Sequence, residues 1–387
     1  MRIGIVAESF LPHVNGVTNS VLRVLDHLAE RGHQALVIAP GARHRLEGAG
    51  EYRGFPIVRV PAVHVPLINS LPLGVPTVGL LRALSGFRPD VIHLASPFVL
   101  GAAGAWAARR LGVPAVAVYQ TDVAGFAHRY HLSALSAAAW EWTRVLHNSC
   151  ALTLAPSSAA SQQLARHGVH RIQRWGRGVD TELFHPRRRD AGLRRQWDTS
   201  GRKFIVGYVG RLAAEKGVER LRALNGVPDV QLVVVGDGPQ REQLQAALPQ
   251  AVFTGQLAGV ELARAYASLD LFVHTGEFET FCQTIQEAQA SGLPVIAPKA
   301  GGPVDLLAGL PPSAGRLLEV DGFERNLLAT VRQLAVSGTA ARVPGIVREH
   351  VRGRTWPAQC DNLLGFYREA MTNFAPRRVP VRARGLS

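Results

Sequence analysis

The chain has 387 residues, of which 47% are hydrophobic and 19% are charged, so it is long enough for two domains and too apolar to be intrinsically disordered. Its formal net charge of +14 favours anionic partners, namely nucleic acid, anionic lipid headgroups or phosphorylated substrates. The three cysteines have no metal-ligand spacing, which argues against a zinc site or a disulfide framework.

Short apolar runs alternate with helical stretches along the first half of the chain. The first run, residues 2–7, is followed by an amphipathic helix over residues 19–30 and a second strand over residues 35–38. Further apolar runs lie at residues 91–94, 115–118 and 152–155. This alternation is typical of a parallel sheet covered by helices on both faces. We expect a first Rossmann-like domain over residues 1–195.

Neither the amino terminus nor any later segment predicts a membrane-spanning helix. The first apolar run is too short for a signal peptide and is followed by Glu8. Residues 60–81 and 91–108 carry no formal charge, but four prolines interrupt the first stretch, and His93 and Pro97 lie in the second. We therefore expect a cytoplasmic protein.

A basic stretch at residues 184–189 interrupts the pattern, which then resumes. The second set of apolar runs lies at residues 204–208, 231–235, 252–254, 271–274 and 295–297. They predict a second Rossmann-like unit over residues 203–355. Because ligands bind at the carboxyl ends of the strands in such sheets, two units in tandem can place two ligand-binding edges on one central cleft. The expected fold class is α/β, suited to a reaction that joins two substrates.

A glycine follows the first strand. Gly16 lies near the start of the first helix, where backbone N–H groups favour anions and the missing side chain lets a phosphate or a sugar approach the backbone. The surrounding sequence is not GxGxxG, so a dinucleotide-binding fingerprint is absent. An ordinary turn between a strand and a helix is the alternative interpretation.

Two cations follow the first strand of the second unit. Arg211 and Lys216 lie five residues apart in the segment GRLAAEKG. Two cations aimed at the negative charge of a leaving diphosphate would lower the barrier to its departure. Exposed loop cations without a ligand are the alternative.

Two carboxylates lie eight residues apart at the end of a later strand. Glu279 is expected in the loop after the strand, and Glu287 about two turns into a helix that starts near Phe281. The free N–H groups around Thr280–Gln283 would point into the same cleft. Such carboxylates can bind sugar and ribose hydroxyls. The alternative is that they are acidic residues favoured by the helix dipole.

Several segments spread over nearly the whole chain share the pattern of one enzyme family. They are AESFLPHVNGV, DVIHLASP, GVDTELFHP, GRLAAEKG, VVVGDGP, FTG, ETFCQTIQEAQASGLPVIA and AGGP. Together they resemble the retaining GT-B glycosyltransferases with an E-x7-E motif. Within that family they are most similar to bacterial GDP-mannose-dependent α-mannosyltransferases of the phosphatidylinositol mannosyltransferase type.

The resemblance implies a role for each candidate residue. Gly16 would lie near the donor phosphates, and Arg211 and Lys216 would clamp them. Glu279 would face the transferred sugar, and Glu287 would hold the ribose. The segment between the two carboxylates would also bind the donor, through Thr280, Phe281, Cys282 and Gln283.

The resemblance also implies how the domains divide the work. Residues 1–195 would bind the acceptor and residues 203–355 the nucleotide sugar, with the C-terminal helix, residues 356–374, packed back on the first domain. The enzyme would move a hexose, mannose from GDP-mannose, to a lipid-linked or other glycan acceptor with retention of configuration. No cofactor is expected, and no metal, because the sequence has no Asp-x-Asp motif. A lipid acceptor and a basic composition imply peripheral contact with an anionic membrane, at the inner face of the cell membrane.

One segment departs from the family. Where members commonly have a histidine, in a segment similar to Tyr-His-Thr-Asp, this chain has Gln120 in Tyr-Gln-Thr-Asp. A glutamine can hydrogen-bond a sugar hydroxyl but cannot take up a proton, so a general base is not expected there. Asp122 is a candidate contact for the acceptor or the donor sugar, and a helix-capping role fits its position equally well.

Other interpretations make different demands on the sequence. The donor can be a UDP-sugar within the same fold. A dinucleotide-dependent oxidoreductase needs the glycine fingerprint and an acid after the second strand, where the chain has Pro40-Gly41-Ala42. A non-catalytic nucleic-acid-binding protein needs a binding fold or aromatic residues clustered among the cations, and neither is found, so no nucleic-acid partner is expected. Biased genome composition accounts for the charge as well, because 40 of the 43 basic residues are arginines.

Overall fold

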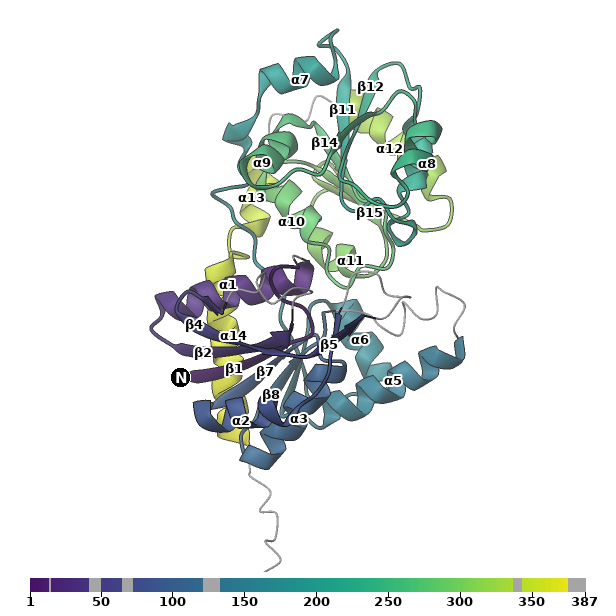
Figure 1. The fold of residues 1–387 in the computed structure, drawn as a ribbon. Helices are drawn as coiled ribbons and strands as arrows, with labels where there is room; N and C mark the ends of the chain where they lie inside the picture. The colour runs from purple at the N-terminus through teal and green to yellow at the C-terminus, as the bar shows by residue number, and fades with distance from the viewer. Residues whose placement is uncertain (14, 42–49, 65–71, 121–132, 337–342, 375–387) are drawn as a thin grey trace, which may run out of the picture. The chain divides into compact units, whose positions relative to one another are not determined.

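The computed structural model describes residues 1–13, 15–41, 50–64, 72–120, 133–336 and 343–374 (Figure 1). The chain divides into two compact units. The first comprises Met1–Ala155, Ser161–Trp175 and Cys360–Ser387, and the second comprises Pro156–Ala160 and Gly176–Gln359. Each unit contains a parallel sheet flanked by helices, so the expected α/β class is confirmed.

The boundary between the two units lies earlier in the chain than the sequence indicates. We expected residues 1–195 in the first domain, but the second unit begins at Gly176. Phe184 lies in the hydrophobic core of the second unit, and Val179 forms a bridge with Thr355. These contacts join residues that are far apart in the chain, so no local pattern in the sequence reveals them.

The first unit is built on an eight-stranded sheet with the order β10-β9-β8-β7-β1-β2-β4-β3. Its strands are β1 (Arg2–Ala7), β2 (Gln34–Pro40), β3 (Glu51–Tyr52), β4 (Phe55–Val60), β7 (Val91–Ala95), β8 (Ala115–Val118), β9 (Leu152–Ala155) and β10 (Ile172–Arg174). Neighbouring strands pair in parallel except for β3 and β4. A separate antiparallel pair is formed by β5 (Ala62–His64) and β6 (Pro72–Gly74).

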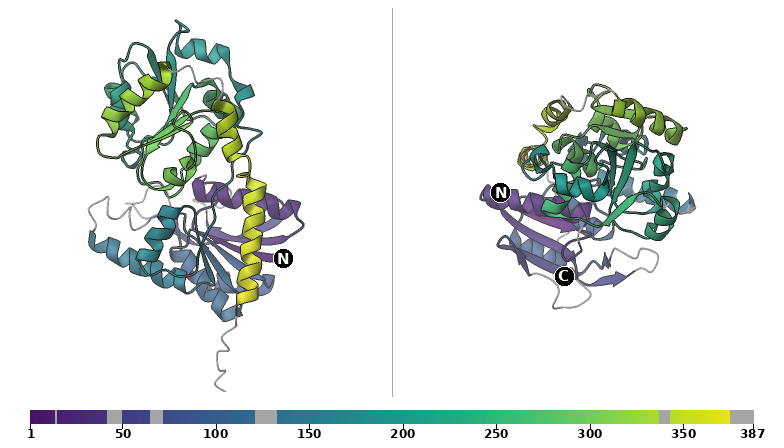
Figure 2. Two further views of the ribbon diagram at one scale, coloured as in Figure 1. Left: turned by 180° about the vertical axis from the view of Figure 1, so that it is seen from behind. Right: turned by 90° about the horizontal axis from the view of Figure 1, so that it is seen from above.

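Helices cover both faces of this sheet (Figures 1 and 2). They are α1 (Gly16–Glu30), α2 (Val78–Phe87), α3 (Val99–Leu111), α5 (Ser133–Asn148), α6 (Ser158–Arg166) and α14 (Trp356–Asn373). Helix α1 begins earlier than expected because Asn15 caps it. The Asn15 side chain accepts hydrogen bonds from Val17 N and Thr18 N, both 3.0 Å. Among the helices that the structure describes, none is both long and apolar enough to cross a membrane.

The C-terminal helix α14 lies across the sheet of the first unit, as Figure 2 shows. The hydroxyl of Tyr367 lies 2.7 Å from His93 Nδ1 on β7, and both side chains are buried. Burial lowers the pKa of His93 to about 4, so its imidazole is neutral at pH 7. Near the start of the helix, Asp361 lies 2.8 Å from His27 Nε2 and accepts a hydrogen bond of 2.7 Å from Arg31. Polar contacts thus fasten α14 to both α1 and the sheet.

The second unit has a six-stranded parallel sheet with the order β13-β12-β11-β14-β15-β16. Its strands are β11 (Phe204–Val209), β12 (Val230–Val235), β13 (Val252–Gly255), β14 (Leu271–Val273), β15 (Val295–Pro298) and β16 (Gly315–Leu318). Its helices are α7 (Ala191–Trp197), α8 (Arg241–Ala247), α9 (Gly259–Ser268), α10 (Gln283–Ala290), α11 (Gly302–Leu307), α12 (Phe323–Val336) and α13 (Val343–Val351).

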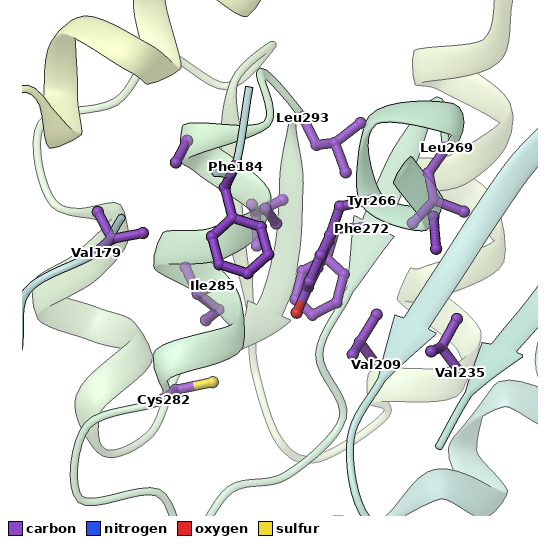
Figure 3. Close-up of a cluster of buried hydrophobic side chains, with 14 of the residues drawn as sticks. Val179, Phe184, Val209, Val235, Tyr266, Leu269, Phe272, Cys282, Ile285 and Leu293 are labelled. Atoms are coloured by element: carbon purple, nitrogen blue, oxygen red, sulfur yellow. The ribbon is translucent and has the colours of Figure 1, made fainter. Parts of the chain in front are cut away.

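Two hydrophobic clusters lie on the two faces of this sheet. Side chains of successive strand residues point to opposite faces, so Val233 and Val235 join one cluster and Leu232 and Val234 the other. The first cluster includes Tyr266 of α9 and is shown in Figure 3. Both faces of the sheet are therefore buried, which explains why its strands are continuous apolar runs rather than alternating ones.

The contact between Tyr367 and His93 gives a test of how α14 is held. We expect Tyr367→Phe to lower the free energy of unfolding by about 1–3 kcal/mol, because His93 Nδ1 loses its buried partner. The matched control is Tyr52→Phe, since Tyr52 also donates a hydrogen bond, to Asp26 (3.0 Å), but from a partly exposed position. Urea denaturation measures both variants. Equal, small losses in the two would contradict a special role for the His93–Tyr367 contact.

Candidate active site

Three neighbouring strands of the second unit end at one edge of its sheet. They are β12, β11 and β14, which are adjacent and parallel. The loops that follow them carry the Gly236–Gly238 turn, then Arg211 and Lys216, and then Glu279. The strand order therefore brings together candidate residues that are far apart in the sequence.

The turn after β12 holds the loop that carries Arg211. Leu212 N donates a hydrogen bond to Asp237 O (2.9 Å). A Cβ atom on Gly236 would lie 1.9 Å from Gly210 O, and one on Gly238 would lie 2.4 Å from Leu212 O. Only glycine permits so close an approach of two backbone segments. The GDGP turn is thus a structural requirement for the position of Arg211.

Arg211 itself is paired within its own loop. Its guanidinium forms an ion pair with Glu215, and 57% of its side chain is exposed. Because the guanidinium side of this pair is exposed, Arg211 is accessible to an anionic ligand.

The central interaction of the site joins Lys216 and Glu279. Lys216 Nζ donates a hydrogen bond of 2.6 Å to Glu279 Oε1, and the side chains are only 27% and 17% exposed. His274 Nε2 lies 3.7 Å from the same carboxylate oxygen. Two of the residues predicted from the sequence are therefore in direct contact, and His274 is a neighbour that the sequence analysis missed.

The charges in this cluster follow from its burial. Burial, the largest effect, raises the pKa of Glu279, but the neighbouring groups, Lys216 first among them, together lower it further, and the net shift is below the ordinary value. For Lys216, burial lowers the pKa and Glu279 raises it, with a net shift upward. Burial lowers the pKa of His274 to about 4. At pH 7 the cluster therefore holds a carboxylate, an ammonium and a neutral imidazole.

Backbone contacts fix the two loops against each other. The hydroxyl of Thr275 donates a hydrogen bond of 2.7 Å to Lys216 O, and Arg220 donates one of 2.8 Å to Thr275 O. Gly217 has a φ of 58°, which lets the chain turn directly after Lys216. The lysine is thus placed by the loop that also carries Glu279.

Helix α10 begins later than the sequence predicts. We expected a start near Phe281, but the first helical residue is Gln283, and Cys282 precedes it with a left-handed φ of 83°. Phe281 and Cys282 are buried in the hydrophobic cluster of Figure 3, so their side chains face the core. Gln283 donates its side-chain N–H to Gly178 O (2.9 Å). These residues can meet a ligand through their backbone, as can Thr280.

The AGGP segment packs on the Glu279 loop. Gly302 N donates a hydrogen bond to Glu279 O (2.8 Å), and a Cβ atom on Gly302 would lie 2.2 Å from Phe281 O. A Cβ atom on Gly301 would lie 2.4 Å from Glu279 O. The two glycines therefore let the loop after β15 support the loop after β14.

Glu287 lies on α10 in a different environment from Glu279. Its Oε2 accepts a hydrogen bond of 3.0 Å from the hydroxyl of Tyr266. Burial raises the pKa of Glu287 to about 7, and the tyrosine only partly opposes this shift. The rings of Phe184 and Phe272 pack around Tyr266, with centroids 5.6 and 5.7 Å away. Tyr266 is thus a second neighbour that the sequence analysis missed.

The remaining candidates belong to the first unit. Gly16 is the first residue of α1 and is exposed, directly after the capping residue Asn15. Gln120 follows β8 at the carboxyl end of the strand and is 8% exposed. Asp122 lies outside the described residues. Gly16 and Gln120 both follow strands of the sheet at their carboxyl ends, where ligands of such folds bind.

Two family models match the chain in succession. Residues 14–183 match the model described as Glycosyltransferase Family 4, and residues 191–310 match the model described as Glycosyl transferases group 1.

Curated proteins resemble the chain over almost its whole length. A GDP-mannose-dependent alpha-mannosyltransferase of Corynebacterium glutamicum is 56% identical over 98% of the chain and 91% of the relative. One of Mycolicibacterium smegmatis is 58% identical over 95% of the chain and 97% of the relative. Among solved structures, Anabaena HepE in complex with UDP and glucose has 20% identity and a TM-score of 0.72, covering 95% of this chain and 99% of that one. This likeness confirms the GT-B fold.

The raised pKa of Glu287 predicts how stability depends on pH. The folded state keeps a proton on this carboxyl up to about pH 7, whereas the unfolded chain loses it near the ordinary value of 4.5. The stabilisation is full below pH 4.5 and is lost as the pH rises through 7, in total on the order of 3 kcal/mol. We expect Glu287→Gln to remove this pH dependence in thermal unfolding measured from pH 4.5 to 8.

The matched control is Glu319→Gln, whose side chain is 66% exposed. It should leave the pH profile of the wild type unchanged. A wild-type profile parallel to that of Glu287→Gln over the whole range would contradict the buried, protonated carboxyl.

Proposed function

The chain belongs to the GT-B glycosyltransferases that combine a family 4 and a group 1 domain, and from this membership we propose that it transfers mannose from GDP-mannose to a lipid-linked or other glycan acceptor. The observation that carries the proposal is the identity of 56–58%, over nearly the whole chain, to GDP-mannose-dependent alpha-mannosyltransferases. A different donor would require changes at the donor site in a chain that is otherwise similar to these relatives.

In this proposal, the donor binds at the strand ends of the second unit. Arg211 and Lys216 hold the diphosphate, the backbone at residues 280–283 contributes N–H groups, and Glu287 binds the ribose hydroxyls. The carboxylate of Glu279 lies 2.6 Å from the ammonium of Lys216. If Lys216 holds the diphosphate, Glu279 lies next to the sugar attached to that diphosphate and binds its hydroxyls. Gly16 leaves room for the donor phosphates beside the backbone, as its lack of a side chain permits.

The transfer proceeds with retention of configuration. The bond between the anomeric carbon and the phosphate oxygen breaks, and its electron pair leaves with GDP. The acceptor oxygen then bonds to the same face of the anomeric carbon, and its proton passes to a phosphate oxygen. Lys216 and Arg211 stabilise the negative charge that develops on the diphosphate. Because these cations are supplied by side chains, the reaction needs no divalent metal ion.

Two other mechanisms would need catalytic groups that Glu279 and Gln120 supply poorly. A covalent route needs Glu279 as a nucleophile, but Lys216 and the low pKa of this carboxylate weaken its nucleophilicity. An inverting route needs a base on the opposite face, and Gln120 cannot take up a proton. Gln120 and Asp122 would instead contact the sugar or the acceptor.

The experiment is a transfer assay with GDP-α-mannose and a lipid extract as the acceptor, in the presence of EDTA. We expect an α-linked mannolipid, identified through the anomeric coupling of its NMR spectrum. Lys216→Ala should lower kcat about a hundredfold or more, the loss seen when one preorganised electrostatic group is removed. Lys299→Ala is the matched control, because Lys299 is exposed and forms a surface ion pair with Glu319 in the same unit.

A different experimental result would contradict each part of the proposal. A β-linked product would exclude retention. Loss of activity in EDTA, restored by magnesium or manganese, would exclude the metal-independent mechanism. Faster transfer from UDP-glucose than from GDP-mannose would assign the chain a different donor, and normal kinetics in Lys216→Ala would remove the lysine from the site.

A lipid acceptor requires contact with a membrane, and the first unit offers a suitable surface. Trp106 on α3 and Trp142 and Val145 on α5 are 53%, 44% and 52% exposed. Trp142 Nε1 donates a hydrogen bond to Phe98 O (3.1 Å), which ties α5 to the start of α3. Arg110 lies over the ring of Trp106, 5.6 Å from its centroid. Aromatic side chains beside arginines suit the interface of an anionic bilayer.

This surface predicts salt-sensitive binding to vesicles. The protein should co-sediment with vesicles containing phosphatidylglycerol at low salt and be released as the salt concentration rises, because screening acts over about 10 Å at 0.1 M. Trp106→Ser should weaken the binding, whereas Val260→Ser, at a valine of the second unit that is 50% exposed, should not. Equal binding to anionic and neutral vesicles, or none at low salt, would contradict the proposal.

A further inference from the structure

One buried imidazole of the second unit, that of His274, has polar atoms that the fold does not use. His274 directly follows β14, and only 3% of the residue is exposed. Within the part of the chain that the structure describes, neither of its ring nitrogens has a hydrogen-bond partner. Buried polar groups in proteins are nearly always paired, so an exception of this kind requires an explanation.

The Nε2 atom of this imidazole lies beside the carboxylate of Glu279. It is 3.7 Å from Oε1, the same oxygen that accepts the 2.6 Å hydrogen bond from Lys216 Nζ. A Cβ atom on Gly276 would lie 3.2 Å from His274 Nε2 and 3.3 Å from Glu279 Oε1, so a larger residue there would crowd both groups. A shift of about 0.5–1 Å would bring Nε2 within hydrogen-bond distance of the carboxylate.

The protonation state of His274 suits a donor without a charge. Burial lowers the pKa of His274 to about 4; Glu279 and the backbone of Gly276 raise this pKa, and Lys216 lowers it. The ring is therefore neutral at pH 7 and carries one proton. The nitrogen that holds this proton is set by its surroundings, and a carboxylate beside Nε2 favours the proton on Nε2.

Binding of the donor changes what Glu279 can rely on. In the proposed function, Lys216 holds the diphosphate, whose negative charge attracts the ammonium away from the carboxylate. The side chain of Glu279 is only 17% exposed, so water replaces a lost hydrogen bond poorly. The carboxylate then needs a second protein donor if it is to keep its orientation beside the sugar.

We propose that His274 is a positioning residue for Glu279, whose Oε1 accepts a hydrogen bond from His274 Nε2–H when Lys216 turns to the diphosphate. The inference rests on the proposed function, in which Glu279 accepts hydrogen bonds from hydroxyls of the transferred sugar. His274 acts through Glu279 and exchanges no proton with the substrate. The orphaned nitrogen thus has its partner in the donor-bound enzyme.

The first test is kinetic and uses the full-length protein. We expect His274→Leu to lower kcat for transfer from GDP-mannose about tenfold or more, because one hydrogen bond to a charged group is lost. Its affinity for GDP, measured by calorimetric titration, should stay within about twofold of the wild type, because GDP lacks the sugar that Glu279 contacts. His274→Gln keeps an N–H donor and should restore kcat to within about threefold of the wild type.

The matched control is Thr330→Val in the same unit. Thr330 lies on α12 and is 6% exposed, and its hydroxyl donates a hydrogen bond of 2.8 Å to Asn326 O. The substitution removes a buried polar group outside the candidate site, so kcat should stay at the wild-type value.

The second test needs no catalysis. In nitrogen-15 NMR of the histidine-labelled wild type, the signal of His274 is assigned by its absence from His274→Gln. We expect a proton on Nε2, and we expect its resonance to move downfield when GDP is added, as the hydrogen bond to Glu279 forms.

Several results would overturn the inference. They are wild-type kcat in His274→Leu, equal losses of kcat in His274→Leu and His274→Gln, and an Nε2 without a proton in the GDP complex. Failure of the proposed function gives a different pattern, in which the wild type itself neither binds GDP nor transfers mannose. If the wild type uses UDP-glucose instead, UDP and UDP-glucose take the places of GDP and GDP-mannose in both tests of His274.

Discussion

The ion pair between Lys216 and Glu279 is the interaction on which the candidate site of the second unit depends. Each partner is largely withdrawn from water, so each requires the other, and removing either one would leave an uncompensated charge. The pair exists because β11 and β14 are neighbours in the sheet, which brings the loops after them to one edge. The hydrogen bond from Thr275 to Lys216 O then fixes the distance between these loops. Sheet topology therefore sets the electrostatics of the site before any substrate arrives.

The loops around this pair approach one another more closely than side chains would allow. Gly236, Gly238 and Gly302 each occupy a place where a Cβ atom would lie within 2.4 Å of backbone carbonyl oxygens. Cys282 departs from this pattern, because it has a Cβ atom in a left-handed conformation that costs about 1–2 kcal/mol for a residue other than glycine. Its sulfur is buried in the hydrophobic cluster, and that burial offsets part of the cost. The strained residue marks the point where the loop after Glu279 becomes the helix that carries Glu287.

The sequence predicted those elements that a local pattern of residues encodes. Apolar runs identified strands β1, β2, β7, β8, β9 and β11 to β15 but missed β3, β4, β10 and β16, and the motif spacing singled out Lys216, Glu279 and Glu287 as candidates. What it missed depends on contacts between distant residues. Tyr266 beside Glu287 comes from another helix, α9. The start of α10 was also misjudged, because the left-handed conformation of Cys282 follows from packing rather than from the preference of a cysteine.

The two glutamates of the motif show how environment divides one chemical group into two roles. Glu279 is surrounded by cations, so its pKa is held low and it remains a carboxylate over the whole physiological range. Glu287 has a tyrosine hydroxyl instead of a cation, and burial raises its pKa to about 7. A permanent carboxylate suits the role that we propose for Glu279, beside a sugar whose bond to phosphate breaks. A carboxyl near neutrality suits hydroxyl binding, because it can accept hydrogen bonds when ionised and donate one when protonated. The eight-residue spacing places one glutamate in the loop and the other on the helix, and that difference in position produces the difference in charge.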